Sequence, residues 1–214
     1  MSSRILDHCH NVIAVTDEPH HHLVIDNEWV RAYAVDIGPG QSTLCHLHSL
    51  PYLMYVAGEA DILNAPRDRE AEEQHFSPDY CDLSPAGLEH VVENLGDSPF
   101  RNMIFEILPA GEKLRRPGLG VAHVAGVTLR ELYSGTPICA QLVELRSGSQ
   151  IQVTGAAIVS SPYENAVEFI SPEHGTVKLD RFRQMEFLPI GSTALLRCES
   201  GDPARALVVT LGCA

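Results

Sequence analysis

Two short stretches of this chain decide its fold. The first runs Gly40-Gln-Ser-Thr-Leu-Cys-His46-Leu-His48, and the second runs Pro85-Ala-Gly87-Leu-Glu-His90-Val-Val-Glu-Asn94. Residues two apart on a β-strand point to the same face of the sheet. The first stretch therefore predicts that His46 and His48 share one face. If that face lines the interior of a barrel, their imidazoles converge on one point, as metal ligation requires.

The sequence around these stretches predicts a succession of short strands. Apolar segments at 29–37, 52–57 and 100–108 are bounded by turn signals, and none has the periodicity of an amphipathic helix. The chain contains 16 Gly and 14 Pro, which suits many tight turns. We therefore expect an all-β sandwich or barrel, in which the strongly charged residues 65–75 form a solvated loop between two strands.

Length and charge limit the classes of function. A chain of 214 residues is one large domain or two small ones. Its 15 Lys and Arg against 28 Asp and Glu give a formal charge of −13, which repels nucleic acid and anionic membrane surfaces at long range. No apolar run approaches the ~20 residues of a bilayer span. We expect a cytoplasmic protein without nucleic-acid or membrane partners, whose six scattered cysteines are reduced thiols.

An internal repeat divides the chain. Residues 30–40 align with 138–148, and the turn and strand start around 83–101 align with 187–205. Two copies of one β unit follow from this alignment, with a boundary near the basic, Gly- and Pro-containing stretch 114–120. Under the same alignment, the second copy carries Thr154, Ala156 and Ala194 where the first carries His46, His48 and His90.

The two stretches match G-x5-H-x-H and P-x-G-x-x-H-x-x-x-N, and in this the chain resembles the cupin superfamily. The resemblance implies two tandem jelly-roll (double-stranded β-helix) barrels. It also implies a divalent metal held by His46, His48 and His90. We expect a metal-binding barrel over residues 1–114 and a degenerate barrel without metal ligands over 115–214. Gly87 and Asn94 correspond to structural positions of the second motif.

The chain departs from the cupin pattern at two positions. A glutamate ligand is expected four or five residues after His48, where Tyr52 and Leu53 stand, and Asp79 replaces the opening glycine of the second motif. Without the glutamate, three neutral imidazoles leave the charge of the metal uncompensated, which favours an anionic ligand. Tyr52 is a candidate catalytic residue, because its phenol could act as a proton donor or weak ligand; the alternative is an ordinary strand aromatic.

Three functions remain open at this point. The leading hypothesis is a dioxygenase-type oxidoreductase acting on a small anionic organic substrate, with iron as the expected metal and zinc, nickel or manganese compatible with the same ligands. The alternatives are a non-catalytic cupin that binds a small molecule or metal as a sensor or store, and a sugar isomerase or epimerase. Cupins often pair through outer strands, so a homodimer is expected by analogy. His20 to His22 precede a strand and are expected to be solvated.

Overall fold

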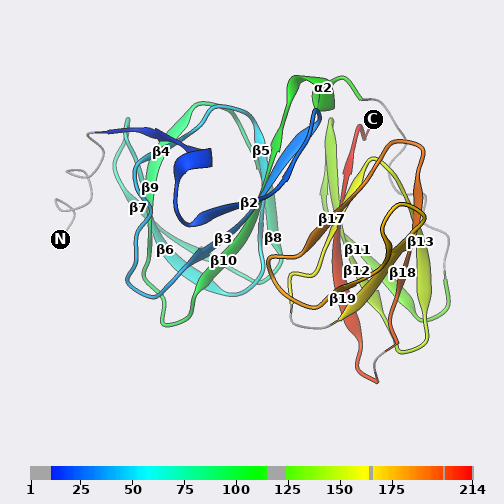
Figure 1. Ribbon diagram of the computed structural model, residues 1–214. Coiled ribbons are helices and arrows are strands. Elements are labelled where there is room, and N and C mark those ends of the chain that lie inside the picture. Colours follow the sequence, from blue (N-terminus) through cyan, green and yellow to red (C-terminus); the bar gives the residue numbers. More distant parts are fainter. Residues whose placement is uncertain (1–10, 115–123, 164–165, 200, 214) are drawn as a thin grey trace. The chain divides into compact units, whose positions relative to one another are not determined.

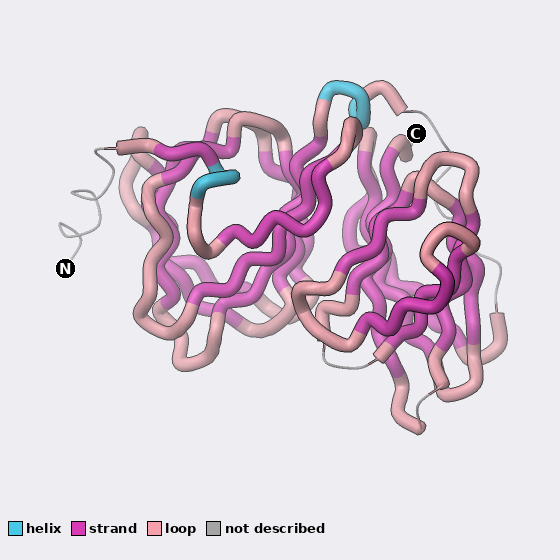
Figure 2. Tube along the Cα trace, viewed as in Figure 1, coloured by secondary structure: helices cyan, strands magenta, loops and turns pink. Residues whose placement is uncertain are grey.

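The computed structural model describes residues 11–114, 124–163, 166–199 and 201–213. Strands dominate these ranges (Figures 1 and 2). Helical structure within them is confined to the 3₁₀ turn η1 (Val15–Asp17) and the short helix α2 (Pro109–Glu112). The all-β class expected from the sequence is confirmed.

The chain forms two compact units. One comprises the residues up to Asp26 together with Val30–Leu108, and the other comprises Asn27–Trp29 and the residues from Pro109 onward. The division after Leu108 comes six residues before the end of the first expected domain. Most of the expected linker, residues 115–120, lies outside the described part of the chain.

The first unit is a barrel of two five-stranded sheets. The strands of one sheet are, in order, β1 (Ile13–Ala14), β4 (His46–His48), β9 (Leu88–Asn94), β6 (Ala60–Pro66) and β7 (Glu72–Phe76). Those of the other are β2 (His21–Asp26), β3 (Val30–Ile37), β10 (Phe100–Ile107), β5 (Tyr52–Val56) and β8 (Tyr80–Ser84). Apolar side chains from both sheets pack into one core, including Tyr33, Val56, Ile62 and Ile104.

The second unit repeats this topology. Its first sheet contains β11 (Val127–Ser134), β12 (Ile138–Leu145), β19 (Ala204–Leu211), β14 (Ala157–Ser160) and β17 (Met185–Leu188). Its second contains β13 (Gln150–Thr154), β18 (Thr193–Arg197), β15 (Val167–Ser171) and β16 (Gly175–Leu179). β12 and β19 occupy the places of β3 and β10, as the repeat in the sequence predicts. The chain therefore consists of two tandem jelly-roll barrels.

Two turn positions of the second motif, Asp79 and Gly87, have positive φ angles. Gly87 has a φ of +93°, a conformation that glycine adopts at little cost. Asp79, at the place of the motif's opening glycine, has a φ of +64°. Asp is one of the few other residues that tolerate this region, and the Tyr55 hydroxyl donates a hydrogen bond of 2.6 Å to its carboxylate. The substitution of glycine by aspartate thus preserves the turn.

The charged stretch at 65–75 is shorter as a loop than the sequence suggested. β6 extends to Pro66 and β7 begins at Glu72, which leaves residues 67–71 as the connection between them. The β6–β7 pairing extends the sheet because Asn64 pairs with Glu72 and Asp61 with His75. The charged side chains of this hairpin are compatible with a strand since its outer face is exposed.

The cysteines also differ from expectation. Cys139 on β12 and Cys213 after β19 form a disulfide, and their Cα atoms are 6.1 Å apart. β12 and β19 are antiparallel neighbours, so the start of one and the end of the other meet at the same edge. Such proximity between residues 74 positions apart depends on strand pairing and leaves no spacing signal in the sequence. Cys81 and Cys198 take part in no disulfide.

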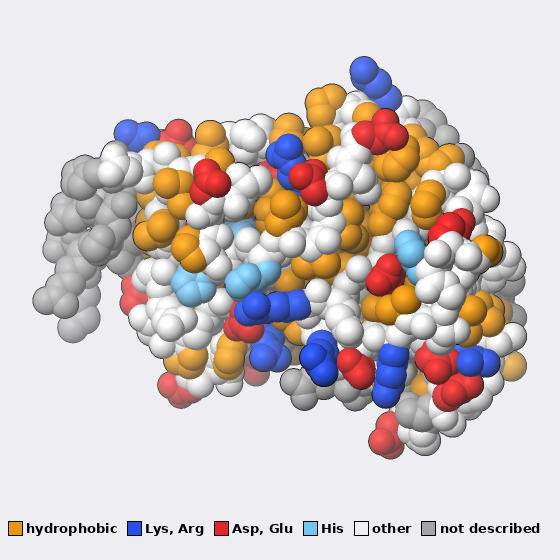
Figure 3. Space-filling model, viewed as in Figure 1, with side chains coloured by type: hydrophobic (Ala, Val, Ile, Leu, Met, Phe, Trp, Pro, Cys, Tyr) orange, Lys and Arg blue, Asp and Glu red, His pale blue; other side chains and the backbone are white. Residues whose placement is uncertain are grey.

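Charged side chains of both signs lie on the surface. Acidic and basic side chains are interspersed on the face shown in Figure 3. Neither helix of the described residues is long and apolar enough to cross a membrane.

Candidate metal centre

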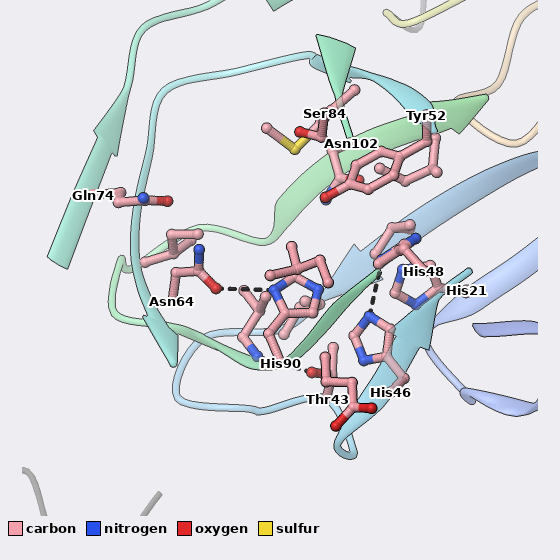
Figure 4. Close-up of a pocket in the computed structure, with 18 of the residues that line it drawn as sticks. His21, Thr43, His46, His48, Tyr52, Asn64, Gln74, Ser84, His90 and Asn102 are labelled. Carbon is pink, nitrogen blue, oxygen red and sulfur yellow. Dashed lines mark hydrogen bonds between the residues drawn. The ribbon is translucent and has the colours of Figure 1, made fainter. Parts of the chain in front are cut away.

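The interior of the first barrel contains a cavity of about 820 Å³. This volume lies in the range of small-molecule binding sites. One part of its lining is apolar, with Val35, Ile37, Met54, Phe76 and Ile104, and another part is a group of four histidines, His21, His46, His48 and His90 (Figure 4). The cavity therefore combines an apolar wall with a cluster of nitrogen donors.

Strand pairing brings the three expected histidines together. β4 pairs with β9 so that His46 lies directly opposite His90, and His48 lies two residues along β4 on the same face. The ring centroid of His46 is 5.0 Å from that of His48 and 4.6 Å from that of His90. All three side chains are buried, at 0%, 1% and 8% exposure respectively. The local pattern of the two motifs thus places all three rings side by side in the cavity, with His48 and His90 5.4 Å apart between centroids.

Hydrogen bonds hold the outer nitrogens of two of these rings. His46 Nδ1 donates to the carbonyl oxygen of Leu44 at 2.8 Å, and His90 Nδ1 donates to Asn64 Oδ1 at 2.9 Å. A neutral imidazole that donates through Nδ1 presents a bare lone pair at Nε2. His90 Nε2 is buried with no hydrogen-bond partner, and His46 Nε2 lies 3.2 Å from His48 Nε2. Imidazoles whose Nδ1 atoms are held by oxygen acceptors and whose Nε2 atoms face one cavity are the arrangement typical of residues that ligate a cation.

A fourth histidine, His21, belongs to the same cluster. His21, His46 and His48 have ligand atoms that all lie within 4.8 Å of one another. The ring of His21 is 4.7 Å from that of His46, and His21 is 8% exposed. The expectation that His20 to His22 are solvated is therefore wrong for His21. The carboxylate of Glu18, which is buried three residues earlier, accepts a 2.7 Å hydrogen bond from His21 Nδ1.

Burial keeps these imidazoles neutral. Desolvation lowers the pKa of His46 to about 4, with repulsion from His21 acting in the same direction. Burial and the neighbouring histidines also lower the pKa values of His48 and His90 well below their ordinary range. Burial alone would raise the pKa of Glu18, but its interactions with His21 and the hydrogen bond from the Leu44 backbone together outweigh burial and lower that pKa. A neutral imidazole is the form that binds metal.

Tyr52 lies against the cluster from the opposite sheet. It occupies the place of the missing glutamate, at the start of β5, and its ring stacks on that of His48 with centroids 4.2 Å apart. The side chain is 4% exposed. Burial raises the pKa of the phenol, although a hydrogen bond with Ser84 lowers it. Tyr52 is thus a neutral hydroxyl that lines the cavity and supports His48.

A buried carboxylate behind His48 was not anticipated. Glu106 on β10 is the register partner of Tyr52 and is 1% exposed. The Tyr33 hydroxyl donates to its Oε2 at 3.0 Å, and its Oε1 lies 4.0 Å from His48 Nδ1. Neither His48 Nδ1 nor Glu106 Oε1 has a hydrogen-bond partner. The acid missing from the strand of the motif is therefore present one strand away, behind a histidine instead of beside it.

The second barrel has an apolar interior where the sequence repeat aligns it with the histidines of the first barrel. Ala194 on β18 pairs with Val153, one residue before the Thr154 that the sequence repeat aligned with His46. Ala156, Val153 and Ala194 are buried, and the last two belong to an extended hydrophobic cluster. Among the described residues, the grouping of three or more close metal-binding side chains lies in the first barrel.

Comparisons with known proteins agree with this architecture. No protein-family model matches the sequence, and no curated protein matches it. Among solved structures, salicylate 1,2-dioxygenase from Pseudaminobacter salicylatoxidans matches with a TM-score of 0.58 and 15% identity, covering 85% of this chain and 70% of that one. A structure of that enzyme with gentisate matches with a TM-score of 0.58, 14% identity and coverages of 85% and 68%.

A further solved structure supports the same fold. The cupin 2 conserved barrel domain protein from Leptotrichia buccalis matches with a TM-score of 0.56 and 9% identity, covering 89% of this chain and 88% of that one. At such identities the similarity concerns the fold alone. Two jelly-roll barrels, the two histidine motifs and these neighbours together show that the chain has the fold of the cupin superfamily.

Proposed function

We propose that the first barrel is a metal-dependent enzyme of the dioxygenase type that acts on a small anionic organic molecule. The observation that carries the proposal is the state of His46 and His90. Each has its Nδ1 engaged by an oxygen acceptor, while its Nε2 faces the other histidines inside the cavity. Outer-sphere acceptors of this kind orient metal-ligating imidazoles in proteins and raise their basicity.

The residues fit a transition metal better than magnesium or calcium. Imidazole nitrogens suit iron, zinc, nickel and copper, whereas Mg²⁺ and Ca²⁺ prefer oxygen ligands. We propose His46, His48 and His90 as ligands and iron as the metal, with zinc, nickel and manganese as alternatives to be distinguished by experiment. When bound, a divalent iron would supply a Lewis-acidic, redox-active centre beside the apolar part of the cavity.

The lining of the cavity suits a small organic anion. Apolar side chains cover part of the wall, and polar Asn64, Gln74 and Asn102 project from other parts (Figure 4). Arg67 and Arg69 line it from the β6–β7 connection, together with Asp68 between them. Arg67 pairs with Glu89 at 2.7 Å, whereas Arg69 makes no ion pair with an acid of the described residues. A guanidinium is well suited to hold a carboxylate.

The absent glutamate suggested that the metal charge would be uncompensated, but Glu18 and Glu106 lie behind His21 and His48. The Glu18 carboxylate, whose pKa is lowered, places a negative charge behind His21 without occupying a ligand position. Burial raises the pKa of Glu106, although the hydrogen bond from Tyr33 lowers it, so Glu106 compensates less. The preference for an anionic substrate therefore rests mainly on Arg69 and on the neutral ligand set.

The proposed reaction needs no external reductant. A dioxygenase inserts both atoms of O2 into one substrate, so the substrate supplies all four electrons that reduce the oxygen. Tyr52 is the proposed proton donor or hydrogen-bond donor, because its neutral hydroxyl lies in the cavity lining beside His48. The second barrel is proposed to be a scaffold without a metal site, and a homodimer through outer strands is proposed by analogy.

Oxygen uptake tests this function. Protein loaded anaerobically with one equivalent of Fe²⁺ would be mixed with a panel of hydroxycarboxylates, thiols and diketones in an oxygen electrode. We expect one substrate to consume one O2 per molecule converted, and His48→Ala treated identically to consume none above free iron. Absence of uptake across the panel, with iron bound, would contradict the enzymatic proposal and favour a binding protein. Turnover of a sugar without oxygen would favour an isomerase.

A further inference from the structure

His21 reaches the cluster from the sheet opposite the other three histidines. It begins β2, which pairs with β3, whereas His46, His48 and His90 lie on β4 and β9. Its ring centroid is 4.7 Å from that of His46 and 5.6 Å from that of His48. In Figure 4, its ring lies next to those of His46 and His48. Both sheets of the barrel thus contribute imidazoles to one point.

The buried carboxylate of Glu18 fixes the orientation of His21. Its Oε2 accepts hydrogen bonds from His21 Nδ1 at 2.7 Å, from the His20 backbone N–H at 2.8 Å and from the His21 backbone N–H at 3.1 Å. Glu18 is 2% exposed, so solvent does not compete for these donors. A His21 ring that donates through Nδ1 presents the lone pair of Nε2 as its remaining polar atom.

Glu18 is also linked to His46. Its Oε1 accepts a 3.2 Å hydrogen bond from the backbone N–H of Leu44, and the carbonyl of Leu44 accepts the 2.8 Å hydrogen bond from His46 Nδ1. One carboxylate therefore holds His21 directly and His46 through a single residue. This connection ties the segment before β2 to the segment before β4, which are 26 residues apart.

The distances between the ring nitrogens allow one ion to bind His21 of β2 together with His46 and His48 of β4. Two imidazole nitrogens bound to one ion at about 2.1 Å can lie at most about 4.2 Å apart. The facing Nε2 atoms of His46 and His48 already satisfy this limit at 3.2 Å. The ligand atoms of His21, His46 and His48 fall within 4.8 Å, so a shift of about half an ångström brings these three within the limit. His90 is not in this grouping and adjoins it through its ring, 4.6 Å from that of His46 between centroids.

We propose that His21 is a fourth ligand of the metal centre and that Glu18 is its positioning residue. This inference rests on the metal site of the proposed function and extends it. With His46, His48 and His90, His21 would give the ion four imidazole nitrogens. The motif glutamate is then replaced as a ligand by a neutral imidazole from another strand, and its negative charge is supplied from behind the rings.

Cobalt binding to variants of the full chain tests this proposal. The variants are His21→Asn, whose amide can still donate to Glu18 but lacks an Nε2, and His21→Ala. His22→Ala is the matched control, because His22 is the next residue of β2 and its side chain is not part of the cavity lining. Co²⁺ would be titrated anaerobically with a competing chelator, and the visible absorption of the bound ion would be recorded.

We expect His21→Asn and His21→Ala to bind one equivalent of Co²⁺ at least about 10-fold more weakly than the wild-type protein, with shifted absorption bands. Glu18→Gln should weaken binding by about 10- to 100-fold, as other outer-sphere substitutions do. His22→Ala should match the wild-type protein. A dissociation constant and spectrum of His21→Asn identical to those of the wild-type protein would overturn the proposal.

The outcome separates this proposal from the metal site itself. If the wild-type protein binds no Co²⁺, the proposed function fails and the role of His21 fails with it. If His46→Ala and His90→Ala lose the ion while His21→Asn retains wild-type affinity and spectrum, the three-histidine site stands and only the fourth ligand is disproved. The melting temperature of each metal-free variant shows whether it is folded.

Discussion

The Nε2 atoms of His46 and His48 face each other at 3.2 Å inside the first barrel. His46 donates through Nδ1 to Leu44, so its Nε2 carries a lone pair directed at the neighbouring ring. In the metal-free protein, neutral His48 can donate its own Nε2 proton to this lone pair, so neither ring needs to be charged. A metal ion held by both Nε2 atoms would take the place of that proton.

Removal of the metal should leave the fold intact. Each barrel has its own apolar core, and the metal site is not needed to join the sheets. We expect protein treated with a chelator to keep its far-ultraviolet circular dichroism spectrum and to melt cooperatively, with the melting temperature lowered by the loss of ligand binding alone. Loss of the melting transition on chelation would instead identify a structural metal.

Tyr52→Phe should separate catalysis from metal binding. The phenylalanine keeps the ring that stacks on His48 and removes only the hydroxyl. We therefore expect wild-type metal content and a decrease in kcat of about 100-fold or more, typical of the loss of a proton donor. Tyr52→Ala is the contrasting variant, which should also weaken metal binding because His48 loses its support. A kcat of Tyr52→Phe equal to that of the wild-type protein would leave Tyr52 only a packing role.

Asn94→Ala should destabilise the first barrel without removing the metal. The buried Asn94 amide donates to the carbonyls of Ile37 and Ser98, both at 2.8 Å, and its oxygen accepts from the Gly96 N–H at 2.9 Å. Because each buried group left without a partner costs about 1–3 kcal/mol, we expect a loss of about 3 kcal/mol in urea unfolding. A loss below about 1 kcal/mol would contradict this structural role.

The metal-free protein should lose stability as the pH falls below neutrality. Burial lowers the pKa of His46 from about 6.5 to about 4, so the unfolded chain binds a proton that the folded protein excludes. The contribution of His46 is complete above pH 6.5 and decreases as the pH falls from 6.5 towards 4. A difference of one between the pKa values of the folded and unfolded states corresponds to about 1.4 kcal/mol of stability.

Urea unfolding of chelator-treated protein between about pH 7.5 and pH 5 measures this effect. The His46→Ala variant is the control, and its free energy of unfolding should depend less steeply on pH. Equal slopes for the two proteins would show that His46 does not have the expected low pKa.

Local patterns were sufficient for much of the fold and part of the site. The spacing of His46, His48 and His90 predicted three side chains on one face, and the 108-residue offset between the starts of β3 (Val30) and β12 (Ile138) reproduces the sequence repeat. These features depend on the period of a strand and on short turns, which are encoded over a few residues.

Contacts between strands that are distant in the sequence could not be predicted from local patterns. His21 belongs to the site only because β2 and β4 lie in opposite sheets, and the triplet of histidines gave no indication of which ring is buried. Glu106 compensates for the glutamate missing at Tyr52 only through the pairing of β10 with β5. The Cys139–Cys213 disulfide likewise depends on the pairing of β12 with β19.

The most direct test of the central claim is the metal content of the protein purified without a metal-affinity tag. Elemental analysis would compare the wild-type protein with His46→Ala, His48→Ala and His90→Ala. Two control variants are Thr154→Ala, in the second barrel, and His75→Ala, which removes an exposed histidine of β7.

We predict about one equivalent of a transition metal, with iron as the expected element, in the wild-type protein and both controls. We predict its loss in the three histidine variants. A wild-type protein that contains no metal and takes up none from solution would contradict the account, as would equal metal loss from Thr154→Ala and His48→Ala.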